Sequence, residues 1–474
     1  GQDHLAYEIE VVNSAGNVRE FVYVDALNGE VVDQITGIHD ALYRRAFDAE
    51  GAAHPGPNYS GNPFWVEGDT LPTADIEADK MIYASAYSLF ENAFGRDSFD
   101  DAGSTMDAIF NRGDACPNAS WNGTYISFCP GLTTDDVTAH EWAHAYTEYT
   151  NNLIYQWQSG ALNESYSDIW GETVDRINGR EDSIGPDVAR TDGSCSVYSE
   201  GSGDDSVRWL LGEDSTAPGL TGALRDMWNP TCHGDPGKVT DAEYYCLSTD
   251  QGGVHTNSGV PNHAYSLMVD GGSYNGFSGT GLGLTKSAHI HWAAQNMLTP
   301  SSNFYDHADA LETSCTALTG LDLSDLSNGT PTGEIITAGD CSKVSAIIAA
   351  VELRTPPTQC GFEPLLAQAP ALCEGMGNVQ SFFSEDFESG ALPAGWSVSS
   401  HDVANPATFD SPGWLVVDDL PPGANGVFAA FAPDLLVGDC AADTEAGAVS
   451  IDSPPIILPA SPTPHVAFNH WVAT

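Results

Sequence analysis

The sequence is poor in positive charge. Of its 474 residues, 15 are Lys or Arg and 66 are Asp or Glu, so the formal net charge is -51. Such a surface repels nucleic acid and anionic membranes, and we expect neither as a partner. We interpret the acidity as an adaptation to a salty or calcium-rich exterior rather than as an acidic recognition patch.

Long apolar runs are missing as well. No stretch approaches the roughly 18 to 20 apolar residues that a membrane-spanning helix needs, so we expect a soluble protein. The first residues are polar, and we recognise no signal peptide in them. With 41% hydrophobic residues the chain can still bury substantial cores, and its length suits two or three domains.

The ten cysteines include no Cys-x-x-Cys pair of the kind that binds structural metals. This pattern indicates disulfides and an oxidising, extracellular compartment. Nearness in the sequence predicts four local bridges, which are Cys116–Cys129, Cys232–Cys246, Cys315–Cys341 and Cys360–Cys373. Cys195 and Cys440 are left over, and they would pair with each other unless Cys440 pairs with a cysteine beyond Thr474.

The segment from Val137 to Tyr149 has no Gly or Pro and several Ala, which predicts a helix. His140 and His144 would then lie one turn apart, with about 5 to 6 Å between Cβ atoms, which suits two imidazoles sharing one zinc ion. Glu141 could reach a metal-bound water without binding the metal, as a general base does. The alternative is a core helix whose histidines bond to backbone or water.

A second segment without helix breakers runs from Ala161 to Trp170. It carries Glu164, 20 residues after His144, and a helix packed against the first could aim this carboxylate at the same ion. Two histidines and a glutamate leave one coordination position for water, as in catalytic zinc sites. Asp168, one turn further on, could accept the other ring N–H of a ligand histidine and fix its tautomer.

Both segments resemble the active-site signature of the thermolysin-like neutral metalloproteases, which are secreted zinc endopeptidases. Further segments match that family in the same order along the chain, namely Asn118-Ala-Ser-Trp121, Leu153-Ile-Tyr155, Ala223-Leu224-Arg225 and Asp250-Gln-Gly-Gly-Val-His255. The resemblance implies an α+β fold with a β-rich N-terminal lobe, an α-helical C-terminal lobe and the zinc helix between them. It also implies one catalytic zinc, bound by the two histidines and the glutamate.

The resemblance implies roles for several further residues. His255, oriented by Asp250 and assisted by Tyr155, would stabilise the oxyanion that forms during hydrolysis. Arg225 would bond a carbonyl of the substrate.

Substrate binding is implied by two groups of residues. Asn118 and Ala119 would pair with an extended peptide by strand addition. The pocket for the residue after the cut bond would accept bulky apolar side chains. Its predicted lining consists of Phe128, Val137, Val188 and Leu224. Gly131 stands where the family usually has a larger residue, which leaves open a roomier pocket.

A structural calcium ion is implied beside the zinc helix. Asp136 and Asp175, with Glu181 or Asp182, resemble ligands of the family's calcium site, and hard carboxylates suit that ion. Pro186 falls where an acidic residue usually bridges two calcium ions. We therefore expect one calcium ion rather than two.

The chain divides into five predicted parts. Residues 1–36 read as strands and resemble the end of the family's propeptide domain, which would make the propeptide a partner. Residues 37–155 would form the β-rich lobe with the zinc helix, and residues 156–355 the helical lobe. Residues 356–380 read as a linker. Residues 381–474 are turn-rich, resemble an accessory β-sandwich or jelly-roll module, and are expected to be truncated.

We therefore expect a secreted, monomeric zinc endopeptidase that acts on proteins and peptides. A catalytically silent binding or adhesin-like protein on the same fold is the alternative, although intact Glu141 and His255 argue against it. An aminopeptidase is disfavoured, because the sequence has no Gly-x-Met-Glu-Asn segment for gripping a free amino terminus.

Overall fold

The computed structural model describes most of the chain. The described residues are 6–12, 19–25, 31–36, 42–53, 63–72, 75–84, 86–178, 185–190, 193–200, 205–220, 222–362, 383–401, 414–418, 427–431 and 448–456.

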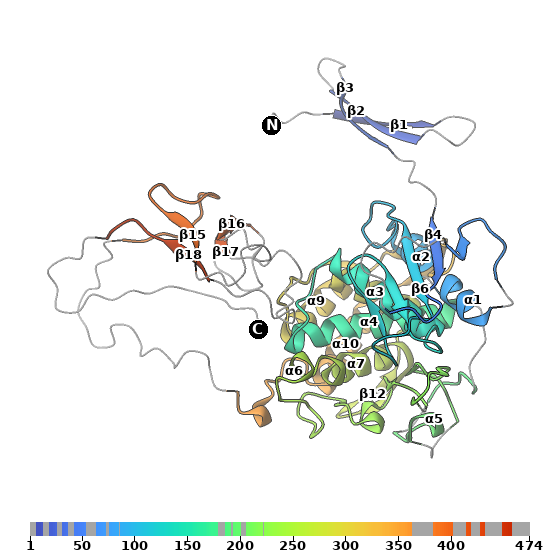
Figure 1. Cartoon of the computed structure of the whole chain (residues 1–474). Coiled ribbons are helices and arrows are strands. Elements are labelled where there is room, and N and C mark those ends of the chain that lie inside the picture. The colour runs from blue at the N-terminus through green and yellow to red at the C-terminus, as the bar shows by residue number, and fades with distance from the viewer. Residues whose placement is uncertain are drawn as a thin grey trace.

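The first three strands form a sheet of their own. Strands β1 (Ala6–Val12), β2 (Arg19–Asp25) and β3 (Val31–Thr36) pair antiparallel in the order β1-β2-β3. Alternating apolar and polar residues predicted these strands, and this prediction is confirmed. Figure 1 shows the sheet at the blue end of the chain.

A mixed five-stranded sheet forms the N-terminal lobe. Its order is β5 (Trp65–Val66), β4 (Arg44–Asp48), β6 (Met106–Phe110), β8 (Ile126–Phe128) and β7 (Ala119–Trp121). Neighbours β4, β6 and β8 run parallel, whereas β7 pairs antiparallel with β8 and forms an edge. An edge strand keeps unpaired backbone groups that an extended peptide can use.

Two short helices follow β5, α1 (Ile76–Tyr83) and α2 (Tyr87–Phe94). The sequence predicts a single helical stretch over residues 75–94, and the structure corrects this. Ala86 has a φ of 61°, a left-handed conformation that an α-helix cannot contain, and it serves as the N-cap of α2.

Helices α3 (Asp135–Glu148) and α4 (Trp157–Ile177) pack together at the centre of the molecule (Figure 1). Asp135 and Asp136 in the first turn of α3 favour helix formation there, because the N-terminal end of a helix attracts negative charge. Gly171 lets α4 approach α3 closely, since a Cβ at that position would lie 2.7 Å from the backbone oxygen of Asp136. Nearly all of both helices is buried.

Helices dominate the C-terminal lobe, as expected for residues 156–355. They are α5 (Val197–Glu200), α6 (Asp250–Asn257), α7 (Gly259–Asp270), α8 (Leu284–Gln295), α9 (Phe304–Ala317) and α10 (Ala338–Ala350). Capping boxes start α9 at Asn303 and α10 at Thr337. Rings of α2, α4 and α8 meet in one aromatic cluster, in which Phe90 lies edge-on to Trp170 and Trp292.

Short hairpins and turns complete this lobe. The paired strands are β9 (Leu210–Leu211) with β10 (Arg225–Asp226), β11 (Gly271–Tyr274) with β12 (Phe277–Thr280), and β13 (Asp322–Ser324) with β14 (Pro331–Ile335). The two 3-10 helices are η1 (Pro230–His233) and η2 (Thr358–Cys360). None of the helices in the described part of the chain combines the length and apolar character that crossing a membrane requires.

Four disulfides lie among the described residues. Cys116–Cys129 and Cys315–Cys341 were predicted and are confirmed. The other two are Cys195–Cys232 and Cys246–Cys360, so the predictions Cys232–Cys246 and Cys360–Cys373 were wrong. Nearness in sequence failed here because the fold brings cysteines 37 and 114 residues apart into contact. Cys373 and Cys440 lie outside the described residues.

The C-terminal region contains two separate pairs of antiparallel strands. They are β15 (Ser397–His401) with β18 (Ala448–Asp452), and β16 (Leu415–Val417) with β17 (Ala429–Phe431). The described residues of this region form strands and no helix, which agrees with the expected β character. A β-sandwich stays a prediction.

Candidate active site

His140, His144 and Glu164 converge where α3 and α4 meet, and we call them the histidine trio. The Nε2 atoms of the two histidines are 3.0 Å apart. The Glu164 carboxylate lies 3.7 Å from His140 Nε2 and 3.5 Å from His144 Nε2. Two nitrogen ligands about 2.0 to 2.1 Å from one tetrahedral zinc would be about 3.3 Å apart, so the donor set and its spacing fit zinc.

Side chains of α4 hold both imidazoles in one orientation. Asp168 Oδ1 lies 2.8 Å from His140 Nδ1, and Asn163 Oδ1 lies 2.7 Å from His144 Nδ1. An acceptor at each Nδ1 favours the tautomer with its proton there, which leaves both Nε2 lone pairs for a metal. The sequence analysis missed Asn163, because nothing in its spacing from His144 shows that the two side chains meet once the helices pack.

The charge states of His144 and Glu164 also suit a metal, whereas the pKa of His140 is raised against the effect of burial by Asp168 and the neighbouring glutamates. Burial lowers the pKa of His144 to about 4, which keeps its imidazole neutral. Burial would raise the pKa of Glu164, but the nearby histidines, His255 foremost, lower it to about 2, so this carboxylate is ionised. Its Oε2 atom has no hydrogen-bond partner among the described residues, as expected of an oxygen reserved for an ion.

Glu141 lies beside the histidine trio and lines the same cavity. Its side chain is buried, and burial raises its pKa to about 7, although His140 opposes this. A carboxyl group with a pKa near neutrality can both take up and release a proton. A dication held by the trio would draw this pKa downward.

His255 and Tyr155 both lie next to Glu164 of the trio. Tyr155 OH donates a hydrogen bond to Glu164 Oε1 and lies 3.1 Å from His255 Nε2. Asp250 Oδ1 lies 2.6 Å from His255 Nδ1, so the carboxylate orients the ring. The negative charge of Glu164, followed by the Asp250 contact, raises the pKa of His255 to about 9 against the effect of burial, which leaves the ring able to donate.

Arg225, in β10, lies at the cavity wall but is already engaged by Asp168. The Nε and Nη2 atoms of Arg225 donate to Oδ2 and Oδ1 of Asp168 at 2.7 and 2.5 Å. Asp168 therefore links His140 on α3 with Arg225. Asn262 also donates to Asp168, at 2.7 Å, so this carboxylate is held from three sides.

The cavity that contains these groups has a volume of about 610 Å³. Asn118 and Ala119 line one side at the edge strand β7. The apolar lining consists chiefly of Leu132, Val137, Leu153, Leu211, Leu220 and Leu224. Of the four residues predicted for the apolar pocket, Val137 and Leu224 are therefore at the wall.

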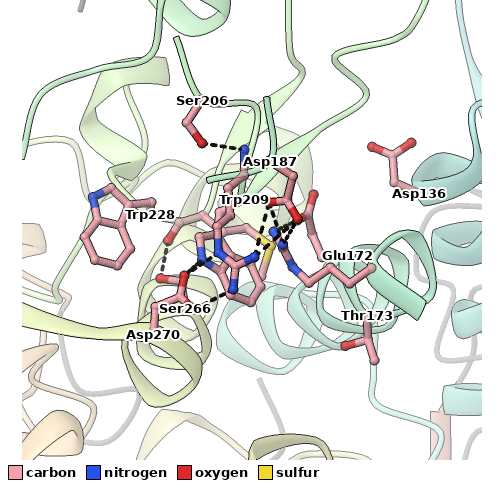
Figure 2. Close-up of polar contacts among 12 residues, drawn as sticks. Asp136, Glu172, Thr173, Asp187, Ser206, Trp209, Trp228, Ser266 and Asp270 are labelled. Atoms are coloured by element: carbon pink, nitrogen blue, oxygen red, sulfur yellow. Dashed lines mark hydrogen bonds and ion pairs between the residues drawn. The ribbon is translucent and has the colours of Figure 1, made fainter. Parts of the chain in front are cut away.

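Phe128 and Val188 are not among the cavity-lining residues. Phe128 is fully buried in the core as part of β8, whereas Val188 is 52% exposed. The neighbour of Val188, Asp187, is held by ion pairs, which Figure 2 draws as dashed lines. Asp187 accepts from Arg176 at 2.9 Å and from Arg208 at 3.2 Å, which fastens this segment to the far end of α4.

Backbone fills the space that a side chain at Gly131 would occupy. A Cβ there would lie 2.6 Å from the nitrogen of Ala217, and Gly131 has a φ of 83°. Its carbonyl accepts bonds from Thr216 N and Ser215 Oγ, both at 3.0 Å. The missing side chain therefore makes room for the 212–220 loop and not for substrate.

Asp136, Glu172 and Glu213 form a second buried cluster, which we call the acidic trio. One carboxylate oxygen of each lies within 4.8 Å of the others, and Figure 2 shows Asp136 and Glu172 on the two central helices. Burial, followed by neighbouring carboxylates, raises the pKa of Glu213 well above its usual range. The pKa of Asp175 is raised likewise, by burial and then by its acidic neighbours.

The predicted calcium ligands map only partly onto this trio. Asp136 belongs to it, and the pKa of Asp175 is raised by burial and then by repulsion from Asp135 and Glu172. Glu181 and Asp182 lie outside the described residues. The sequence analysis missed Glu172 and Glu213; an i, i+3 spacing from Glu172 to Asp175 on a predicted helix was the available signal for the first.

These features define a metal site with two histidines, one carboxylate, an open side and an adjacent buried base. Two protein-family models match the chain in tandem: the thermolysin metallopeptidase catalytic domain over residues 39–148 and the thermolysin metallopeptidase α-helical domain over residues 151–327. The chain belongs to the thermolysin metallopeptidase family.

Individual relatives agree with this assignment. A zinc metalloproteinase of Renibacterium salmoninarum is 35% identical over 55% of this chain and 44% of its own length. Bacillolysin of Brevibacillus brevis is 36% identical over 54% of this chain and 44% of its own. Thermolysin of Alicyclobacillus acidocaldarius is 36% identical over 51% and 42%. The chain thus spans less than half the length of these relatives.

A solved structure is also similar to this chain. The precursor of protealysin, a metalloproteinase from Serratia proteamaculans, aligns over 67% of this chain and 89% of its own, with 23% identity and a TM-score of 0.48.

Proposed function

We propose that the protein is a zinc-dependent endopeptidase and that it is secreted. The observation that carries this proposal is the histidine trio with buried Glu141 beside it in one open cavity. Membership of the thermolysin metallopeptidases supports the same reaction. Zinc bound by the trio would polarise the scissile carbonyl and lower the pKa of its water.

The remaining chemistry is assigned to side chains of this chain. Glu141 would accept a proton from the attacking water and deliver it to the leaving amine. Tyr155 and His255 would donate hydrogen bonds to the oxyanion, and Asp250 would keep His255 in the donating orientation. Asp168 would keep the His140 ring aligned while it also fixes Arg225.

Peptide binding is assigned to the edge of the sheet. The backbone of Ala119 in β7, with the side chain of Asn118, would pair with an extended substrate. Arg225 would bond a substrate carbonyl with the part of its guanidinium that Asp168 does not occupy. The apolar wall with Val137 and Leu224 supports a preference for a bulky apolar residue after the cut bond.

The deciding experiment removes the base and keeps the metal. Glu141→Gln should bind zinc as the wild type does, yet lose about 10²- to 10⁴-fold in kcat, the usual contribution of a general base. Casein hydrolysis with and without a zinc chelator, together with metal analysis of both proteins, provides the measurement. A variant that keeps most of its rate would refute the assigned base.

We also propose one structural calcium ion at the acidic trio, with Asp175 nearby. Calcium prefers carboxylate oxygens, and Glu213 Oε2 has no hydrogen-bond partner among the described residues. An ion there would link α3, α4 and the loop after β9. Isothermal titration of calcium into zinc-loaded protein tests this proposal, and the absence of binding heat would remove it.

The three-stranded sheet at residues 6–36 is proposed to be a remnant of the propeptide. Its family resemblance supports this, and the enzyme's own propeptide would then be a partner as well as its protein substrates. Removal of residues 1–36 should leave peptidase activity intact if the sheet has no part in the mature site.

A further inference from the structure

The backbone just before His255 has an uncommon conformation. Asp250, Gln251, Gly252 and Gly253 have φ angles of 53°, 47°, 93° and 79°, all in the left-handed region. A residue with a side chain adopts this region only at a cost, so surrounding contacts must hold it there. This loop carries Asp250, which accepts bonds from both the Nδ1 atom and the backbone nitrogen of His255.

The buried side chain of Asn257 bonds both this loop and Tyr245, which precedes the loop. Asn257 Nδ2 donates to Tyr245 O at 3.0 Å and to Gly252 O at 3.4 Å. Its Oδ1 accepts from Tyr245 N at 2.8 Å. Asn257 is 1% exposed and is not among the cavity-lining residues. Its amide therefore fixes the loop from behind without access to substrate.

Aromatic rings close the remaining space around the loop. A Cβ on Gly252 would lie 2.4 Å from the Trp157 ring, and one on Gly253 would lie 2.6 Å from Tyr245. Both glycines are therefore required by close packing as well as by their φ angles. The loop has no room to relax toward the rings, so its main freedom is movement away from them.

The segment after α10 reinforces the same contacts. The Cys246–Cys360 disulfide ties the neighbour of Tyr245 to η2. Phe362 then packs edge-on against Trp157, with ring centroids 5.3 Å apart. Gln359 Nε2 donates to Val239 O at 2.6 Å. Residues 359–362 thus pack against the Trp157 ring and are bonded covalently to the neighbour of Tyr245.

We propose that Asn257 is a positioning residue, which holds the left-handed loop so that Asp250 keeps His255 aimed at the reacting oxygen. This role rests on the proposed function, because it matters only if His255 acts in peptide hydrolysis. Asn257 touches neither substrate nor metal, and it acts through the Asp250–His255 pair. The disulfide next to Tyr245 and the ring of Trp157 against Gly252 support the same loop.

The test compares two substitutions at this position. Asn257→Asp keeps the shape and the Oδ1 acceptor but loses both donor bonds, and Asn257→Ala loses all three. A shift of about 1 Å at a catalytic group costs on the order of 10²-fold, so we expect kcat to fall about 10- to 100-fold. We expect KM to stay within about threefold, since His255 would act mainly in the transition state.

A second readout separates positioning from general loss of structure. Affinity for a phosphonamidate peptide, which mimics the tetrahedral transition state, should fall in parallel with kcat, whereas affinity for a product peptide should not. Asn275→Ala is a control at an exposed asparagine, whose Nδ2 also bonds a backbone carbonyl, that of Ala350, at 2.7 Å. It should leave both affinities unchanged.

Two disulfide variants test the same role if the Asn257 variants fail to fold. Replacing Cys246 and Cys360 by serine should lower kcat several-fold without raising KM, and the same change at Cys315 and Cys341 should not. Wild-type kcat in soluble Asn257 variants, or equal effects of the two disulfide pairs, would overturn the positioning role. An inactive wild type would instead overturn the proposed function.

Discussion

The histidine trio and the acidic trio both take side chains from α3 and α4, yet they differ in how their members are held. Each imidazole has an acceptor at Nδ1, 2.8 Å away for His140 and 2.7 Å away for His144. One carboxylate oxygen in each trio, Glu164 Oε2 and Glu213 Oε2, has no hydrogen-bond partner within the described ranges, but the acidic trio consists of carboxylates alone. The first site is therefore arranged before a metal arrives, whereas the second holds like charges that need a cation or protons.

The origin of the ligands also differs between the two sites. His140, His144 and Glu164 come from two helices that follow one another in the chain. Glu213 instead comes from the loop after β9, and it joins Asp136 and Glu172 only because that loop packs over Gly131. A site built within a helix pair can be recognised by its spacing, and one closed by a distant loop cannot.

The largest expected effect comes from comparing the same substitution, glutamate to glutamine, in each of the two sites. Glu164→Gln should abolish peptide hydrolysis and reduce bound zinc, because it removes the charged ligand. Glu213→Gln should keep zinc and most of the activity. Metal analysis and peptidase assays on both proteins provide the measurement. Equal zinc loss in both would show that the sites are not independent.

Asn163→Ala tests whether the prearranged imidazole matters. Loss of the acceptor at His144 Nδ1 should weaken zinc binding by about 10- to 100-fold, the usual effect of removing a partner of a metal-bound histidine. Competition with a zinc-binding dye measures this affinity. An unchanged affinity would show that packing alone orients His144.

The acidic trio should make stability depend on pH when calcium is absent. Burial first, and then neighbouring carboxylates, raises the pKa of Glu172, Asp175 and Glu213 in the folded chain. The folded chain thus holds more protons than the unfolded one, so stability falls as pH rises through the raised pKa values. Each group adds a slope of up to about 1.4 kcal/mol per pH unit.

Calcium should remove this slope, because it binds the ionised carboxylates and replaces their protons. Denaturant unfolding between pH 5 and 8, on zinc-loaded protein with and without calcium, measures the difference. Glu213→Gln should reduce the calcium-free slope. A slope that is the same in both conditions would contradict a cation at the acidic trio.

The smallest expected effect concerns the surface. With a net charge of -51, repulsion between carboxylates destabilises the folded chain, and salt screens it. The melting temperature should therefore rise by a few degrees from low to high NaCl, as measured by calorimetry. An unchanged melting temperature would mean that the surface charges are already balanced locally.

The local features of the site could be predicted from the sequence. The i, i+4 spacing of His140 and His144 on an unbroken helix follows from helix geometry, and Glu164 and Asp168 share the next helix at the same spacing. Cys116–Cys129 could be predicted since its partners flank one hairpin. Each of these features depends on residues that are close in the chain, where the backbone alone limits the possible arrangements.

Long-range packing explains the remaining differences. The Cys246–Cys360 bridge, the contact between Asn163 and His144, and the closure of the acidic trio by Glu213 each join separate elements. Val188 was misplaced for the same reason, because ion pairs of Asp187 with Arg176 and Arg208 fix its segment.

The two metal-binding helices and the three zinc ligands follow from residue types at fixed helical spacing, and the acidic surface follows from composition. Which side chains fix each imidazole, what fills the space beside Gly131, and how Asn257 holds the loop before His255 depend on how distant segments pack together. The physical reason is that hydrogen bonds and close packing between distant segments depend on positions to within about an ångström, and spacing along the chain does not set such positions.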